Sequence, residues 1–152
     1  MFRKIADRSA VRKVRRAHLT TTEREGFVST KGKLCGINQP QDQKAPTDFE
    51  KKHTPLIVCP DEVTAGVPFA VTLKVGALPH VREEGHFIQW AEIKFGESLY
   101  ARVEFSPVLA VPEATVTLVK GGKHDKGTLR VLARCNLHGL WEATKEITIR
   151  PA

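Results

Sequence analysis

Cysteine is scarce in this sequence: Cys35, Cys59 and Cys135 are the three cysteines of a 152-residue chain. An odd number of cysteines at irregular spacing does not form the disulfide framework of a small secreted domain, so we expect a reducing, cytoplasmic environment. No apolar run is long enough to cross a bilayer, which excludes a membrane-spanning helix. The first residues carry charge throughout and lack the apolar core of a secretory signal peptide.

Over most of the chain, basic residues barely outnumber acidic ones. Residues 1–19 hold seven Lys and Arg against the single acid Asp7, whereas residues 20–152 hold 17 bases against 16 acids. The net charge of +7 therefore belongs almost entirely to an N-terminal arm. A nucleic-acid-binding face on the folded body is accordingly not expected. The arm itself is compatible with an organellar presequence, an oligomer contact or a solubilising tail.

The pattern of the chain changes near residue 48. Residues 1–48 are interpreted as a basic extension and linker, with a short helix over 3–17. Residues 49–152 show short apolar or alternating runs separated by turn residues, which predicts one β-rich domain. Seven short strands in about 100 residues indicate an all-β, seven-stranded immunoglobulin-like β-sandwich behind an irregular N-terminal extension. The expected strands are 55–59, 68–75, 87–95, 99–105, 114–119, 127–134 and 142–150.

Histidines gather at the connections between these strands, where binding sites are usually built. His53 precedes the first strand, and His80 and His86 bracket the loop before the third. His138 shares a turn with Cys135. Taken singly, each of the five is better explained as a packed or capping side chain, since a lone Cys-x-x-His pair defines no metal site. Only their joint pattern indicates a shared metal centre.

Three motifs carry these residues: EKKHTP at 50–55, LPHVREEGHFIQW at 78–90 and CNLHGLW at 135–141. In their order and separations they resemble the superoxide reductase family, which includes neelaredoxin and the iron domain of desulfoferrodoxin. The resemblance covers about residues 49–150. One such motif alone is a weak signal, whereas three in the family's order are specific.

The resemblance implies an oxidoreductase with one iron per subunit, held by four imidazoles in a plane and an axial thiolate. Imidazole and thiolate together suit ferrous iron, and five protein ligands leave one position open. The implied activity is one-electron reduction of superoxide to hydrogen peroxide without release of dioxygen, helped by the electron-rich thiolate. A rubredoxin-like or other one-electron donor and a homo-oligomer, dimer or tetramer, are also implied. The implied ligands are His53, His80, His86, Cys135 and His138.

Of the charged residues before His53, Lys52 stands where the family motif has its lysine, whereas Glu50 is displaced from the place of the family's glutamate. Lys52 takes the place of the lysine that draws superoxide, an anion, toward the open position. The family commonly reads Glu-Lys-His, with the glutamate at the sixth position of resting ferric iron. This chain reads Glu50-Lys51-Lys52-His53, so Glu50 is displaced by one residue and needs a flexible loop to reach iron.

The sequence also lacks a second metal centre that desulfoferrodoxin has. That centre uses four cysteines including an adjacent pair, whereas residues 1–49 contain only Cys35. In the 135–141 motif, Asn136 and Gly139 are expected to shape the turn so that backbone N–H groups donate to the thiolate.

Two functions from other classes remain open. A non-catalytic immunoglobulin-like carrier or interaction domain would keep its stability and function in Cys135→Ser. A nucleic-acid binder with a vestigial site would hold no iron, and it would lose salt-sensitive binding on removal of residues 1–19.

Overall fold

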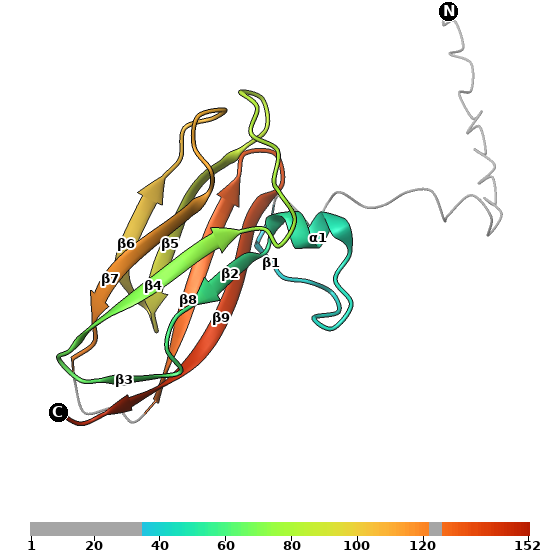
Figure 1. Ribbon diagram of the computed structural model, residues 1–152. Helices are drawn as coiled ribbons and strands as arrows, with labels where there is room; N and C mark the ends of the chain where they lie inside the picture. The colour runs from blue at the N-terminus through green and yellow to red at the C-terminus, as the bar shows by residue number, and fades with distance from the viewer. Residues whose placement is uncertain (1–34, 122–125) are drawn as a thin grey trace, which may run out of the picture.

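A computed structural model of the chain describes residues 35–121 and 126–152 (Figure 1). The helix expected over 3–17 and most of the basic extension lie outside these ranges. Among the described residues, no helix has the length and apolar character needed to cross a membrane.

Two β-sheets form a sandwich (Figure 1). The larger sheet has the order β1-β9-β8-β5-β6, with β3 also on β9, and the smaller has the order β2-β4-β7. Neighbouring strands are antiparallel, except that β1 and β3 run parallel to β9. The strands are β1 (Ile37–Asn38), β2 (Pro55–Val58), β3 (Glu62–Thr64), β4 (Pro68–Val75), β5 (Ile88–Phe95), β6 (Ser98–Glu104), β7 (Glu113–Val119), β8 (Lys126–Cys135) and β9 (Gly139–Arg150).

The all-β sandwich expected from the sequence is confirmed, and each of the seven expected ranges overlaps one strand. Two short strands, β1 and β3, and one helix, α1 (Asp48–His53), were not expected. With two and three residues, β1 and β3 are too short to show a periodic pattern. The immunoglobulin-like classification stays a prediction.

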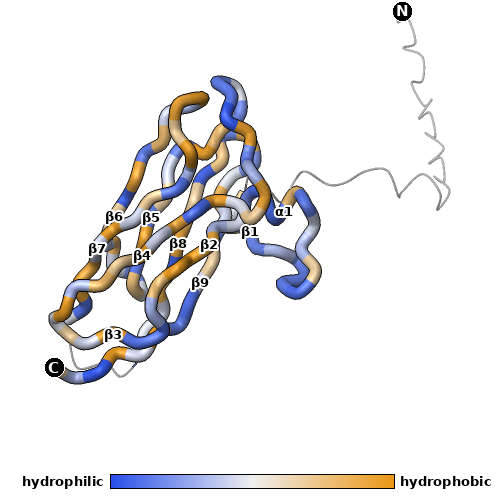
Figure 2. Tube along the Cα trace, in the orientation of Figure 1, coloured by the Kyte–Doolittle hydropathy of each residue, from blue (hydrophilic) through white to orange (hydrophobic). Residues whose placement is uncertain are grey.

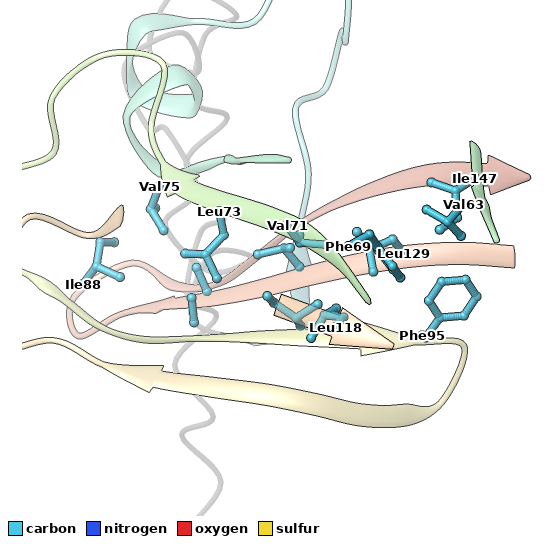
Figure 3. Packing of buried hydrophobic residues seen from close by; sticks show 14 of the residues in the cluster. Val63, Phe69, Val71, Leu73, Val75, Ile88, Phe95, Leu118, Leu129 and Ile147 are labelled. Atoms are coloured by element: carbon cyan, nitrogen blue, oxygen red, sulfur yellow. The ribbon is translucent and has the colours of Figure 1, made fainter. Parts of the chain in front are cut away.

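Alternation along the strands explains the core. In β4, every second side chain is buried, and its inward residues meet those of β5 and β8 across the sandwich (Figure 3). Apolar and polar residues alternate along the strands in the same way (Figure 2). Each buried large aliphatic side chain contributes about 1.5–3 kcal/mol relative to an exposed one. Leu73, Ile93, Leu129 and Val131 are completely buried.

The connections with the expected ligands meet at one end of this rigid core. Pro55, which begins β2 two residues after the last residue of α1, pairs with Val75 at the end of β4. Cys135, which ends β8, pairs with Ile88 at the start of β5 and with Gly139 at the start of β9. The end of α1, the loop 76–87 and the turn 136–138 therefore lie side by side (Figure 1).

Candidate metal centre

His53 is the last residue of α1, and its side chain is buried. Its Nδ1 lies 2.6 Å from the carbonyl oxygen of Phe49, one helical turn earlier. A carbonyl oxygen can only accept, so Nδ1 carries the ring proton and Nε2 keeps its lone pair. Nε2 lies 2.9 Å from Nδ1 of His138. Helix α1 thus sets the tautomer of His53 that suits a metal ligand.

The loop 76–87 supplies two more buried ring nitrogens. Nδ1 of His80 donates to the carbonyl of Val81 at 2.6 Å, which leaves the lone pair of His80 on Nε2. Nε2 of His80 and Nε2 of His86 are both buried and have no hydrogen-bond partner among the described residues. His86 is fixed by a two-bond bridge to Glu83, with N–H to carbonyl distances of 3.0 Å in both directions. Two unpaired buried polar atoms are costly unless something else binds them.

The thiol of Cys135 is completely buried at the end of β8. Its Sγ lies 3.6 Å from Nδ1 of His138. The backbone N–H groups of Leu137 and His138 donate to Sγ, as expected for a thiolate at this turn. Gly139 closes the turn with a φ of 76°, a conformation that favours glycine.

Asn136 links this turn to the loop that carries His86. Its side-chain Oδ1 accepts from the N–H of Phe87 at 2.9 Å, and its Nδ2 donates to the carbonyl of Gly85 at 2.9 Å. Its backbone N–H also donates to the carbonyl of Phe87 at 3.2 Å. Three hydrogen bonds of Asn136 therefore fix the position of the loop with His86 relative to the turn with Cys135.

The four imidazoles stand around a common centre. Neighbouring rings meet edge to face, with 75° to 90° between their planes. Neighbouring centroids are 4.7 Å apart for His53–His80 and His80–His86, and 4.8 Å apart for His86–His138 and His53–His138. The facing pair His53–His86 is 6.2 Å apart with 24° between ring planes.

Four of the five expected ligands bring their donor atoms within 4.8 Å of one another: His53, His86, Cys135 and His138. His80 lies outside that group, although its ring is a neighbour of His53 and His86. Imidazole nitrogens with a thiolate suit a transition metal such as ferrous iron, whereas calcium and magnesium prefer oxygen ligands. The unpaired nitrogens of His80 and His86 agree with such an ion, so the residues fit an iron centre.

Burial sets the protonation of the cluster. Burial, reinforced by the neighbouring imidazoles, lowers the pKa of His53 and of His80 to about 4, although the backbone carbonyls that accept from their Nδ1 atoms raise it. Burial raises the pKa of the Cys135 thiol, against the lowering effect of its two backbone N–H donors. At neutral pH the imidazoles of His53 and His80 are therefore neutral, the form that binds metal, whereas the thiol must lose a proton when a cation enters.

Acid should destabilise the metal-free protein. An unfolded histidine titrates near pH 6.5, whereas His53 and His80 titrate near pH 4 in the folded chain. The unfolded state thus binds more protons between these values, so stability is full above about pH 6.5 and is lost as pH falls toward about 4. We expect a loss of roughly 3 kcal/mol or more, because two histidines contribute while solvent screening reduces the contribution of each, measured by urea unfolding of metal-free protein between pH 7.5 and 4. A free energy of unfolding that stays constant over this range would contradict the burial of neutral imidazoles.

Lys52 and Glu50 both lie on α1, and their side chains differ in surroundings. Lys52 is exposed, and its positive charge helps to lower the pKa of His80, which places it within electrostatic reach of the cluster. The Glu50 carboxylate accepts from the N–H and the hydroxyl of Thr47, both at 2.8 Å, and from the N–H of Gln41 at 2.9 Å. These bonds place the Glu50 carboxylate at the first turn of the helix.

Sequence reasoning missed the residues that orient the ligands. The carbonyls of Phe49 and Val81 fix two histidine tautomers, which no side-chain motif reveals. Asn38 of β1 donates to the carbonyl of Leu140 at 2.8 Å, so a residue of the expected linker supports the turn after Cys135. Only the helix start had a visible signal, because Thr47 followed three residues later by Glu50 is a capping box.

Several known proteins resemble this chain in sequence. A protein of Methanocaldococcus jannaschii named as a candidate superoxide reductase is 44% identical over 115 residues, which cover 76% of this chain and 96% of that protein. The superoxide reductase of Pyrococcus horikoshii is 38% identical over 102 residues, covering 60% of this chain and 84% of that protein.

The chain also resembles solved structures of superoxide reductases. The superoxide reductase (neelaredoxin) from Ignicoccus hospitalis aligns with a TM-score of 0.59 at 42% identity, covering 64% of this chain and 81% of that one. Residues 45–144 match the family model described as Desulfoferrodoxin, a span that includes all five expected ligands. The chain therefore belongs to the desulfoferrodoxin family.

Proposed function

We propose that this protein is a superoxide reductase with one iron per chain. In this reaction one superoxide takes up one electron and two protons and becomes one hydrogen peroxide, with no dioxygen formed. The observation that supports it best is the convergence of imidazole nitrogens and one thiol at the end of the sandwich. The proposed ligands are His53, His80, His86, His138 and Cys135.

The iron, when bound, supplies the one-electron change between its ferrous and ferric states. The carbonyls of Phe49 and Val81 hold the rings of His53 and His80 with Nε2 toward the centre. The thiolate of Cys135 would hold the iron as an electron-rich ligand, and the backbone N–H groups of Leu137 and His138 hold its sulfur in place.

Lys52 is proposed to attract superoxide, because it is an exposed cation within electrostatic reach of His80. We expect Lys52→Ala to lower the second-order rate constant for superoxide about 10-fold and to weaken its dependence on ionic strength. Stopped-flow mixing at several salt concentrations measures both. Lys51→Ala is the matched control, since Lys51 is the neighbouring cation of α1 and pairs with Asp48 at 3.2 Å. Equal rates and salt slopes for wild type and Lys52→Ala would count against this role.

Other expectations for this protein rest on the family resemblance or on the composition of the chain. A rubredoxin-like donor, a homo-oligomer and a cytoplasmic location stay predictions, as does the domain boundary at residue 48. Contact of Glu50 with ferric iron is the alternative to the role argued below, and the ferric spectrum of Glu50 variants distinguishes the two. A carrier domain without catalysis is not favoured, because it would leave the buried nitrogens of His80 and His86 unpaired.

The proposed activity can be tested directly on ferrous protein mixed anaerobically with superoxide. We expect one hydrogen peroxide for each iron oxidised, with no dioxygen release. Protein loaded with zinc in place of iron is the control, because zinc has no redox chemistry. Evolution of dioxygen would indicate dismutation instead, and unreacted ferrous iron would exclude the proposed activity.

A further inference from the structure

We propose that Glu50 is a positioning residue of the metal centre, which orders helix α1 and thereby orients His53. This role rests on the proposed function, because it concerns the way in which a ligand of the iron is held. It gives Glu50 a task at the start of the helix that does not require contact with the metal.

Both oxygens of the Glu50 carboxylate are occupied by donors that precede the helix. Oε2 accepts from the backbone N–H and from the hydroxyl of Thr47, and Oε1 accepts from the N–H of Gln41. In return, the N–H of Glu50 donates to Oγ1 of Thr47 at 3.3 Å, which completes a capping box. One carboxylate thus joins the segment after β1 to the first turn of α1.

Helix α1 depends on such support because it has only six residues. A helix of that length is not stable on its own in water. Its last turn is tied to the loop 76–87, since the carbonyl of Lys51 accepts from the N–H of Ala77 at 2.8 Å. Its first turn is held by the capping box, by the bond from Gln41 to Glu50 and by the ion pair between Lys51 and Asp48, and Glu50 takes part in the first two.

The order of α1 matters to the metal centre through one contact. The bond from Nδ1 of His53 to the carbonyl of Phe49 spans four residues, so it exists only while the helix keeps its turn. Fraying of the first turn would remove this acceptor and release the ring to other tautomers and rotamers. Loss of the cap should therefore weaken iron binding indirectly, through the orientation of His53.

The one-residue displacement of Glu50 from the family pattern fits this role. A capping box needs its acid at the third helical position, three residues after the N-cap Thr47, and Glu50 stands there. Lys51, which stands two residues before His53, pairs with Asp48 on the helix surface.

The test compares Glu50→Ala, Glu50→Gln and Thr47→Val in the full chain, with Asp48→Asn as control. Asp48→Asn removes another first-turn charge from an exposed side chain that takes no part in the cap. Ferrous iron affinity is measured by competition with a chelator, and the ferric visible spectrum is recorded. Amide exchange of Lys51 and Thr54, which donate to the carbonyls of Thr47 and Glu50 within α1, is followed in metal-free protein.

We expect Glu50→Ala and Thr47→Val each to weaken iron affinity about 3- to 10-fold and to speed amide exchange in α1. Combining them should add little, because both remove the same cap. Glu50→Gln should recover most of the affinity, since glutamine also serves at this position. The ferric spectrum and the Asp48→Asn affinity should stay as in wild type.

The opposite pattern would overturn the proposal. If Glu50→Gln altered the ferric spectrum as strongly as Glu50→Ala while Thr47→Val changed nothing, Glu50 would act on the iron itself. Unchanged affinity and exchange in both alanine and valine variants would also refute it. Wild-type protein that bound no iron would refute the proposed function, while the exchange rates would still decide whether Glu50 orders α1.

Discussion

Cys135→Ser should abolish the visible thiolate-to-iron band of the ferric protein and lower the rate of superoxide reduction at least about 100-fold. The thiol lies fully buried at the end of β8, 3.6 Å from Nδ1 of His138, and receives two backbone N–H groups. Changes in the residues around a metal ligand already cost about 10–100-fold in metal affinity or activity, so loss of the thiolate should cost at least as much. Absorption spectra and superoxide stopped-flow measure the two effects.

Cys59→Ser provides the matched control for that change. Cys59 is also a free cysteine, half-buried after β2, and packs against the core without a place in the histidine cluster. We expect this variant to keep the visible band and the rate. A Cys135→Ser protein that retained the band, or a Cys59→Ser protein that lost it, would show that the thiolate has been assigned to the wrong residue.

Gly76→Ala should lose iron and about 3 kcal/mol or more of stability. Gly76 follows β4 with a φ of +94°, and an added Cβ would lie 2.4 Å from the carbonyl oxygen of Leu78 and 2.7 Å from that of Lys52. Both neighbours are backbone atoms, which cannot turn aside as a flexible side chain does. The clash would therefore push α1 away from the loop 76–87 and separate His53 from His80.

Gly66→Ala separates the effect of this clash from backbone strain. Gly66 also has a positive φ, +79°, but an added Cβ would meet nothing within 4 Å. The Gly66→Ala variant should lose only about 1–2 kcal/mol of its free energy of unfolding, the strain of a left-handed residue, and should keep its iron. Urea unfolding and iron content distinguish the two variants. Equal losses of stability, with full iron content in both, would mean that the contact between α1 and the loop does not position the ligands.

Strands were predictable where a long run alternates and faces one core. The prediction of 68–75 coincides with β4, because every second side chain of that segment is buried. β1 was not predictable, since it consists of Ile37 and Asn38 paired in parallel with Leu140 and Trp141, about a hundred residues later. A two-residue pairing at such separation leaves no periodic signal.

The ligand residues were predictable because three motifs in order carry them, whereas their orientation was not. The tautomer of His53 depends on a carbonyl in a six-residue helix that begins at the end of the expected linker. The tautomer of His80 depends on the carbonyl of the next residue, Val81. The bonds of Glu50 depend on the path of the chain between β1 and α1. Such details come from backbone geometry, which side-chain patterns do not encode.

X-ray absorption at the iron edge of the ferrous protein tests the central assignment most directly. The assignment predicts one iron per chain with four imidazole nitrogens and one sulfur around it, and loss of the sulfur signal in Cys135→Ser. Iron surrounded by oxygen ligands without sulfur, or protein that takes up no iron under reducing conditions, would contradict it.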